Sequence, residues 1–130
     1  MKVLLATDGN GPAEAALIHL ARLVRSGGLP GTHHEIVVLT VSETSAGISH
    51  IARAKELLAR EGITARALWR VGADPVNLIV ATAQDEHVDL VVLGCRPRLV
   101  GASDKPGSVS DGVLRRSPVP VLVVRDQLAG

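Results

Sequence analysis

The chain has 130 residues, enough to bury a core, and we predict a single domain over residues 1–130. Hydrophobic residues make up 46% and charged residues 21%, as in soluble globular proteins, and the formal net charge of +1 excludes a strong general attraction to nucleic acid or anionic membranes. Trp69 is the only aromatic residue, so the chain also lacks the stacking side chains of RNA-binding folds. A core of Val, Leu, Ile and Ala suits a buried parallel sheet covered by helices.

The cysteine content and the amino-terminal segment both bear on the compartment. Cys95 is the only cysteine and cannot form an intrachain disulfide, which fits a reducing environment. The apolar run after Lys2 is interrupted by Thr7 and Asp8, too early for the core of a signal peptide. No apolar stretch approaches the length of a membrane span. We therefore expect a cytoplasmic protein.

Five short runs rich in Val, Leu and Ile, bounded by Gly, Pro or polar residues, predict buried strands. These runs cover residues 2–7, 36–41, 63–71, 88–93 and 119–124. Between them, apolar residues recur at helical spacing in stretches that begin near Pro12, Ile48, Pro75 and Ser108. Strands that alternate with helices predict an α/β fold with a parallel, doubly wound sheet and right-handed crossovers.

Local signals set the expected helix ends. Asp74 followed by Pro75 is a typical helix start, with the aspartate as N-cap. In the second helix we expect a buried stripe, and a polar loop over residues 42–47 before it. The stripe consists of Ile48, Ile51, Ala54 and Leu58.

Ligands of open parallel sheets bind beyond the carboxyl ends of the strands, where the strand order reverses. The segments to inspect therefore follow Thr7, Val41, Gly72 and Gly94. The chain offers no convincing set of nucleophile, general base and metal ligands, so we predict no catalytic residue and no metal site, and at most very slow ATP hydrolysis.

Several segments, in this order and spacing, resemble the universal stress protein family along nearly the whole chain. They are Val3–Gly9, Gly72–Pro75, Asp89–Gly94, Gly107–Ser110 and Pro118–Val124. The resemblance implies a three-layer αβα, flavodoxin-like fold of the adenine nucleotide alpha hydrolase-like type. Its five-stranded parallel sheet would have the order 3-2-1-4-5.

One branch of that family binds ATP through Gly, two residues, Gly, nine residues, then Gly followed by Ser or Thr. The present chain keeps this spacing with Gly94, Gly107 and Ser108, but Pro97 replaces the second glycine. Proline has no backbone N–H and holds φ near about −65°, whereas glycine would supply an amide or a positive φ beside a phosphate. Either one phosphate contact is lost, or the loop follows another path.

The resemblance implies that Asp8 faces the ribose or adenine, that the backbone at Val41 contacts the adenine edge, and that residues 107–110 bind phosphate at a helix N-terminus. Arg96, with Arg98 and Lys105, would add positive charge. The expected cofactor-binding residues are Ala6, Thr7, Asp8, Val41, Leu93, Gly94, Arg96, Gly107, Ser108, Val109 and Ser110.

Simpler interpretations of the same residues remain open. Asp8 could only cap a turn, and residues 107–110 could only begin a helix. His33 and His34 fit a solvent-exposed loop better than a metal site, since no second ligand pair accompanies them. We interpret Cys95 as a passive thiol and Trp69 as a packing or edge residue.

Two functions follow as hypotheses. The first is a stress or signalling module that binds ATP, with Mg²⁺, or a related adenine nucleotide. The alternative is a nucleotide-independent interaction module of the same family, because Pro97 replaces a binding-loop glycine. In either case the apolar last strand, with Val119, Val121 and Val123, is expected to pair two copies into a homodimer, since an apolar sheet edge needs a cover.

Overall fold

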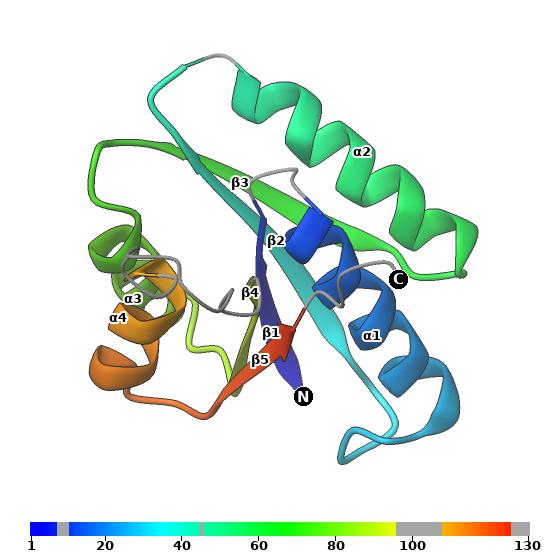
Figure 1. Cartoon of the computed structure of the whole chain (residues 1–130). Helices are drawn as coiled ribbons and strands as arrows, with labels where there is room; N and C mark the ends of the chain where they lie inside the picture. The colour runs from blue at the N-terminus through cyan, green and yellow to red at the C-terminus, as the bar shows by residue number, and fades with distance from the viewer. Residues whose placement is uncertain (8–10, 45, 96–107, 126–130) are drawn as a thin grey trace, which may run out of the picture.

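The computed structural model describes residues 1–7, 11–44, 46–95 and 108–125. A five-stranded parallel sheet forms the centre, in the order β3-β2-β1-β4-β5 (Figure 1). Its strands are β1 (Lys2–Ala6), β2 (Glu35–Ser42), β3 (Ala65–Val71), β4 (Leu90–Cys95) and β5 (Val121–Arg125). The predicted fold class and strand order are confirmed.

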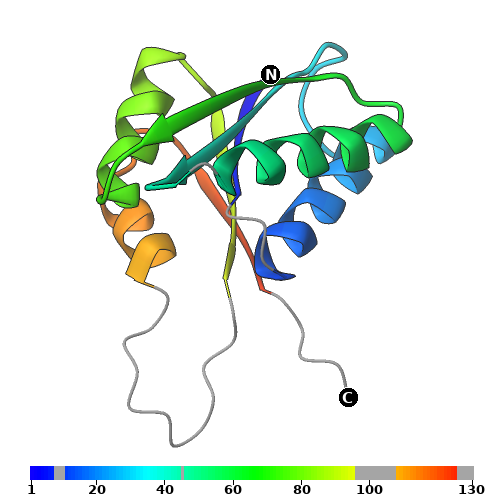
Figure 2. The same cartoon turned by 90° about the horizontal axis from the view of Figure 1, so that it is seen from above.

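Helices cover both faces of this sheet. The four are α1 (Gly11–Ser26), α2 (Ala46–Arg60), α3 (Pro75–Asp85) and α4 (Ser108–Arg116). Helices α1 and α2 lie on one face and α3 and α4 on the other, which the view from above shows as two separate layers (Figures 1 and 2). The expected N-cap is present, because the Asp74 carboxylate accepts a hydrogen bond from the Asn77 amide at 3.1 Å.

The side chains of β1 alternate between two apolar clusters. Val3 and Leu5 pack toward α1 and α2, whereas Leu4 packs toward α3 and α4, and all three are fully buried. Burial on both faces explains why the strand shows a continuous apolar run and no polar alternation. The inner residues of α1, among them Leu17 and Leu20, lie in the first cluster.

Two strands begin later than their apolar runs predict, at Ala65 rather than Ile63 and at Leu90 rather than Val88. The Ile63 amide bonds the carbonyl of Leu58, and the Val88 amide bonds that of Ala83. Both residues are buried, but their backbone closes the end of the preceding helix, where an apolar contact commonly accompanies the cap. The fifth strand likewise begins at Val121, after Pro120, and not at Val119.

The expected inner stripe of α2 is wrong at its first residue. Ile48 is 57% exposed, whereas Ala54 and Leu58 are buried. Gly47 takes the inward position instead, since a Cβ at this residue would lie 2.5 Å from the Trp69 Nε1 atom. Ser42 belongs to β2 and Gly47 to α2, so the predicted loop over 42–47 is too long at both ends.

An ion-pair network ties together the amino ends of the first three strands. Lys2 Nζ lies 3.4 Å from Glu86 and 3.5 Å from Glu35, and Arg66 pairs with the same two carboxylates. The hydrogen bond from Arg66, reinforced by Lys2, lowers the pKa of Glu86. Since these groups lie far from the carboxyl ends of the strands, we assign them a structural role.

Replacing Glu86 should therefore change how stability depends on pH. A carboxylate whose folded pKa is lowered stabilises the fold above its unfolded pKa of about 4.3, and this contribution disappears as the pH falls through the folded value. Glu86→Gln should be less stable than the wild type at pH 7, and the difference should shrink as the pH falls below about 5. Urea unfolding over a pH series measures it. The exposed Glu56→Gln, which breaks the surface pair with Arg60, is the control, and a pH-independent difference would contradict this assignment.

Candidate functional site

The strand order reverses at β1, whose two neighbours are β2 and β4. In such sheets the crevice beyond the carboxyl ends of the strands at this reversal is the usual ligand site. The structure brings several of the predicted residues to this edge from three adjacent strands. They are Ala6 at the end of β1 and Thr7 directly after it, Val41 near the end of β2, and Leu93 and Gly94 near the end of β4. Asp8, Arg96, Pro97, Arg98, Lys105 and Gly107 lie outside the described residues.

The side of this edge that faces α3 and α4 is apolar. Ala6 and Leu93 are buried there in one cluster with Val113 of α4, and Val41 and Val109 pack against the cluster. These side chains form a hydrophobic floor that reaches from β2 to the first turn of α4. Val41 and Val109 are only half-buried, so they are the part of this floor that an apolar group of a ligand could contact.

The first turn of α4 borders the floor. Ser108, Val109 and Ser110 occupy this turn, as predicted, and the leading backbone amides of a helix have no partners within the helix. They favour an anion together with the helix dipole. Asp111, also in the first turn, is paired with Arg115 at 3.3 Å, which partly offsets its negative charge.

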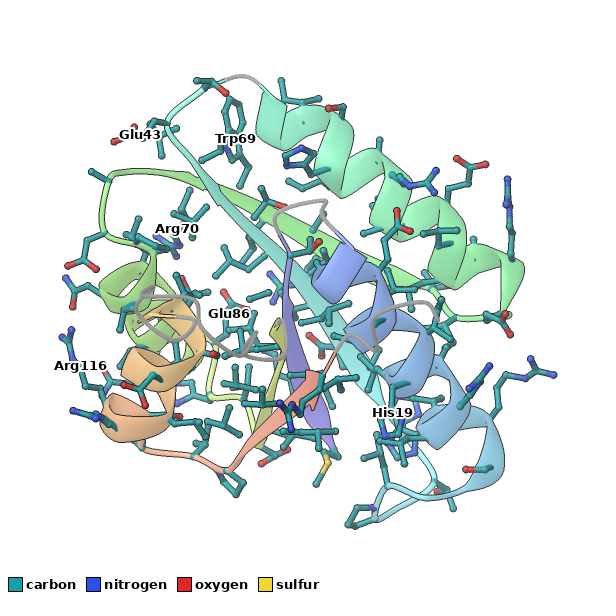
Figure 3. The ribbon with its side chains drawn as sticks, viewed as in Figure 1. His19, Glu43, Trp69, Arg70, Glu86 and Arg116 are labelled. Carbon is teal, nitrogen blue, oxygen red and sulfur yellow. The ribbon has the colours of Figure 1, made fainter. Side chains whose placement is uncertain are left out.

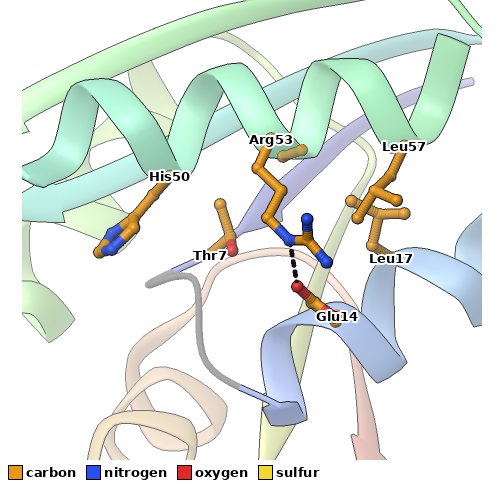
Figure 4. A pocket seen from close by; sticks show the side chains of 7 residues that line it. Thr7, Glu14, Leu17, His50, Arg53 and Leu57 are labelled. Atoms are coloured by element: carbon orange, nitrogen blue, oxygen red, sulfur yellow. Dashed lines mark hydrogen bonds and ion pairs between the residues drawn. The ribbon is translucent and has the colours of Figure 1, made fainter.

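A small cavity lies on the opposite side of the edge, beneath α1 and α2. Thr7 points into a cavity of about 10 Å³ between the two helices, whose mouth carries an ion pair of 2.5 Å between Arg53 Nε and Glu14 (Figure 4). The carboxylate of Glu14 raises the pKa of Arg53. A cavity of this size has room for about one water molecule, so it cannot hold a nucleotide. We take the side toward α3 and α4, where the apolar floor meets the first turn of α4, as the candidate ligand face.

Arg70 is a residue that sequence reasoning missed. It pairs in register with Val41, and alternation along β3 puts its side chain on the face of Leu68, toward α3 (Figure 3). The side chain is half-buried, and its Nε atom is buried without a hydrogen-bond partner among the described residues. An unsatisfied buried donor is destabilising by about 1–3 kcal/mol, so its presence in a native fold calls for a physical reason. In the sequence, Arg70 could be noticed by its position near the end of a predicted strand, just before Gly72–Pro75.

Comparison with known proteins decides the family. The Universal stress protein family matches residues 1–125. The chain belongs to this family. Universal stress protein YxiE of Bacillus subtilis is 31% identical over 120 residues, covering 87% of this chain and 80% of that protein. The family match over residues 1–125 includes every strand of the sheet.

Solved structures support the same assignment. The hypothetical protein MJ0577 superposes with a TM-score of 0.77 at 25% identity, covering 98% of this chain and 97% of that one. A universal stress protein in complex with cAMP superposes with a TM-score of 0.75 at 25% identity, covering 98% of each chain. The universal stress protein described here therefore shares its whole fold with a relative that holds an adenine nucleotide.

The structure also shows where Trp69, His33 and His34 lie, which the sequence analysis considered as possible functional residues. Trp69 packs over Gly47 and is 37% exposed, in line with a packing role on the edge strand. His33 is exposed and His34 is half-buried, and the described ranges hold no group of three or more His, Cys, Asp or Glu residues placed to bind a metal ion. Within those ranges, no helix has the length and apolar character to cross a membrane.

The packing of α4 on α3 should control the position of the α4 amino-terminus. A Cβ at Gly112 would lie 2.8 Å from Cγ2 of Val76, so Gly112→Ala should overpack this interface. We expect a loss of about 1–3 kcal/mol of unfolding free energy, partly offset by about 1 kcal/mol of improved helix propensity. The cost should be smaller in a Val76→Ala background, which urea denaturation of the double-mutant cycle measures. Additive effects would show that the two residues do not meet.

Proposed function

We propose that this universal stress protein binds an adenine nucleotide, ATP or a close relative, at the carboxyl edge of its sheet. The observation that supports the proposal is that two features meet on the sheet face toward α3 and α4. The anion-binding first turn of α4 borders the apolar floor of Ala6, Val41 and Leu93. A nucleotide has the matching chemistry, since it joins a phosphate to a flat, largely apolar base. The cAMP complex of a relative with the same fold supports this assignment.

The expected division of contacts follows from these positions. The phosphates would bind the amides of the α4 first turn, where Ser108 and Ser110 lie. The base would lie over the floor, with its polar edge toward the backbone at Val41. Mg²⁺, where it accompanies ATP, would be held chiefly by the phosphates, as is usual for this ion.

The protein would act by occupancy and not by turnover. The described part of the chain holds no group of His, Cys, Asp or Glu residues placed to hold a metal ion that would activate water. Binding would bias conformation or partner choice in a stress or signalling pathway. We further propose a single cytoplasmic domain over residues 1–130, in keeping with the lone cysteine.

A nucleotide-independent interaction module is the second candidate, because Pro97 stands where the ATP-binding branch of the family has glycine. Without an N–H, this residue cannot donate to a phosphate. If the lost contact were decisive, the protein would act through its surfaces alone.

Calorimetric titration with ATP and Mg²⁺ separates the two candidates. The wild type should bind with micromolar affinity, a typical range for cellular small-molecule ligands, and Gly107→Val should abolish binding by placing a branched side chain beside the phosphates. Pro97→Gly should bind at least as tightly, since it restores an amide and relaxes φ. A wild type that does not bind, together with a Pro97→Gly variant that does, would establish the interaction module.

The homodimer is also a proposal. Strand β5 is an outer strand of the sheet, and the side chains of Val121 and Val123 remain half-buried in the single chain. An apolar edge with an unpaired row of backbone groups invites a partner, and a second copy supplies an identical one about a two-fold axis. The occupant we propose is therefore β5 of another copy.

Light scattering at micromolar concentration should give the mass of two chains. Val123→Lys should yield monomers, because it would place charges close together across the two-fold axis. Ile48→Lys is the matched control: Ile48 is 57% exposed on α2, which packs on β2 and β3 at the other end of the sheet from β5, and its replacement should leave the dimer intact. A monomeric wild type would rule the dimer out.

A further inference from the structure

We propose that Arg70 is a ligand-contacting residue that donates hydrogen bonds to a ring nitrogen of the nucleotide base. This inference rests on the proposed nucleotide-binding function and assigns to it a base-reading side chain. Three observations carry it: the direction of the side chain, the separation of β3 from α4, and the contrast with Arg66 on the same strand.

The first observation is that Arg70 lies on the ligand face. Its register partner is Val41, and its side chain lies on the side of the sheet that carries the apolar floor, toward α3 (Figure 3). Trp69, the preceding residue, points to the other face, where it packs on Gly47 of α2. The end of β3 therefore directs a cation toward the proposed ligand and an apolar ring away from it.

The second observation places Arg70 at the base end of the nucleotide. Helix α4 contacts β4 and β5, whereas Arg70 is on β3, three strand spacings from β4. Strands lie about 4.8 Å apart, so this separation is roughly 14 Å at the level of the backbone. A nucleotide held by its phosphate at α4 has to extend along the floor toward β2 and β3. Its base, not its phosphate, then comes within reach of the Arg70 side chain.

The third observation is that the Arg70 guanidinium has no ion-pair partner among the described residues, whereas the guanidinium of Arg66 on the same strand has two. Arg66 lies on the same face of β3 and pairs with both Glu35 and Glu86. Arg70 pairs with no carboxylate in the described part of the chain, and its buried Nε has no acceptor there. Arginine carries five N–H donors and no acceptor, so the missing partner must offer lone pairs.

Adenine supplies suitable lone pairs at N1, N3 and N7. Arginine is a frequent donor to purine acceptors, and hydrogen bonds from charged groups are among the stronger ones in proteins. The planar guanidinium also stacks readily on aromatic faces, which would favour a purine on the floor. Arg70 would thus add both affinity and preference for a purine with a free ring nitrogen at this position.

Titration of ATP and its 1-deaza, 3-deaza and 7-deaza analogues into the wild type and Arg70→Met tests the assignment. Arg70→Met should bind ATP about tenfold or more weakly than the wild type, as expected for a lost charged hydrogen bond. One of the three analogues should bind the wild type about tenfold or more weakly than ATP does. That same analogue should show no further loss with Arg70→Met, because the contact is already absent.

Arg66→Met is the matched control, since it removes an arginine from the same face of the same strand at the distant amino end. Its affinity for ATP should equal that of the wild type. Emission from Trp69, the single tryptophan, reports whether each variant is folded. A wild type that fails to bind ATP would refute the proposed function itself. Unchanged ATP binding by Arg70→Met, or an equal loss for ATP and all three analogues, would refute only the contact with the base.

Discussion

The structure depends on burial of the central strand β1 on both faces. Val3, Leu4 and Leu5 are fully buried, and the strand is hydrogen-bonded to β2 on one side and to β4 on the other. A strand without a solvent-facing side needs helices above and below, and parallel pairing needs crossovers that carry those helices. The same arrangement puts the reversal of strand order at β1, so the requirement that buries its side chains also creates the crevice at its carboxyl end.

The nearly complete absence of aromatic residues shapes this arrangement further. The largest fully buried side chains are Leu, Ile and Val, and they divide into one cluster beneath α1 and α2 and another beneath α3 and α4. Branched aliphatic side chains interdigitate closely, which is consistent with the cavity of about 10 Å³ beneath α1 and α2. The cavity between α1 and α2 is thus too small for a nucleotide. Trp69 fits this pattern, because it covers the start of α2 from the outside.

The sequence predicted the topology well because periodicity and turn signals report burial directly. It placed Ala6, Val41 and Leu93 at one edge, and the structure has them in one cluster. Strand starts were harder, since Ile63 is buried but serves a helix cap. The exposed Ile48 was missed because a glycine, which carries no hydrophobic signal, occupies the inward position. Arg70 could not be found by composition or motif, because its meaning depends on the register of β3 with β2.

The two arginines on one face of β3 differ in their ion-pair partners. At the amino end, Arg66 shares two carboxylates with Lys2, and the network joins three strands and the end of α3. At the carboxyl end of the same face, Arg70 has no such partner among the described residues. His34, Thr40 and His50 also carry a buried side-chain atom without a partner among the described residues, so Arg70 is distinguished by its positive charge and by its place at the carboxyl end of β3. The paired end is therefore structural, and the unpaired end beside the apolar floor is where we propose that a ligand with lone pairs binds.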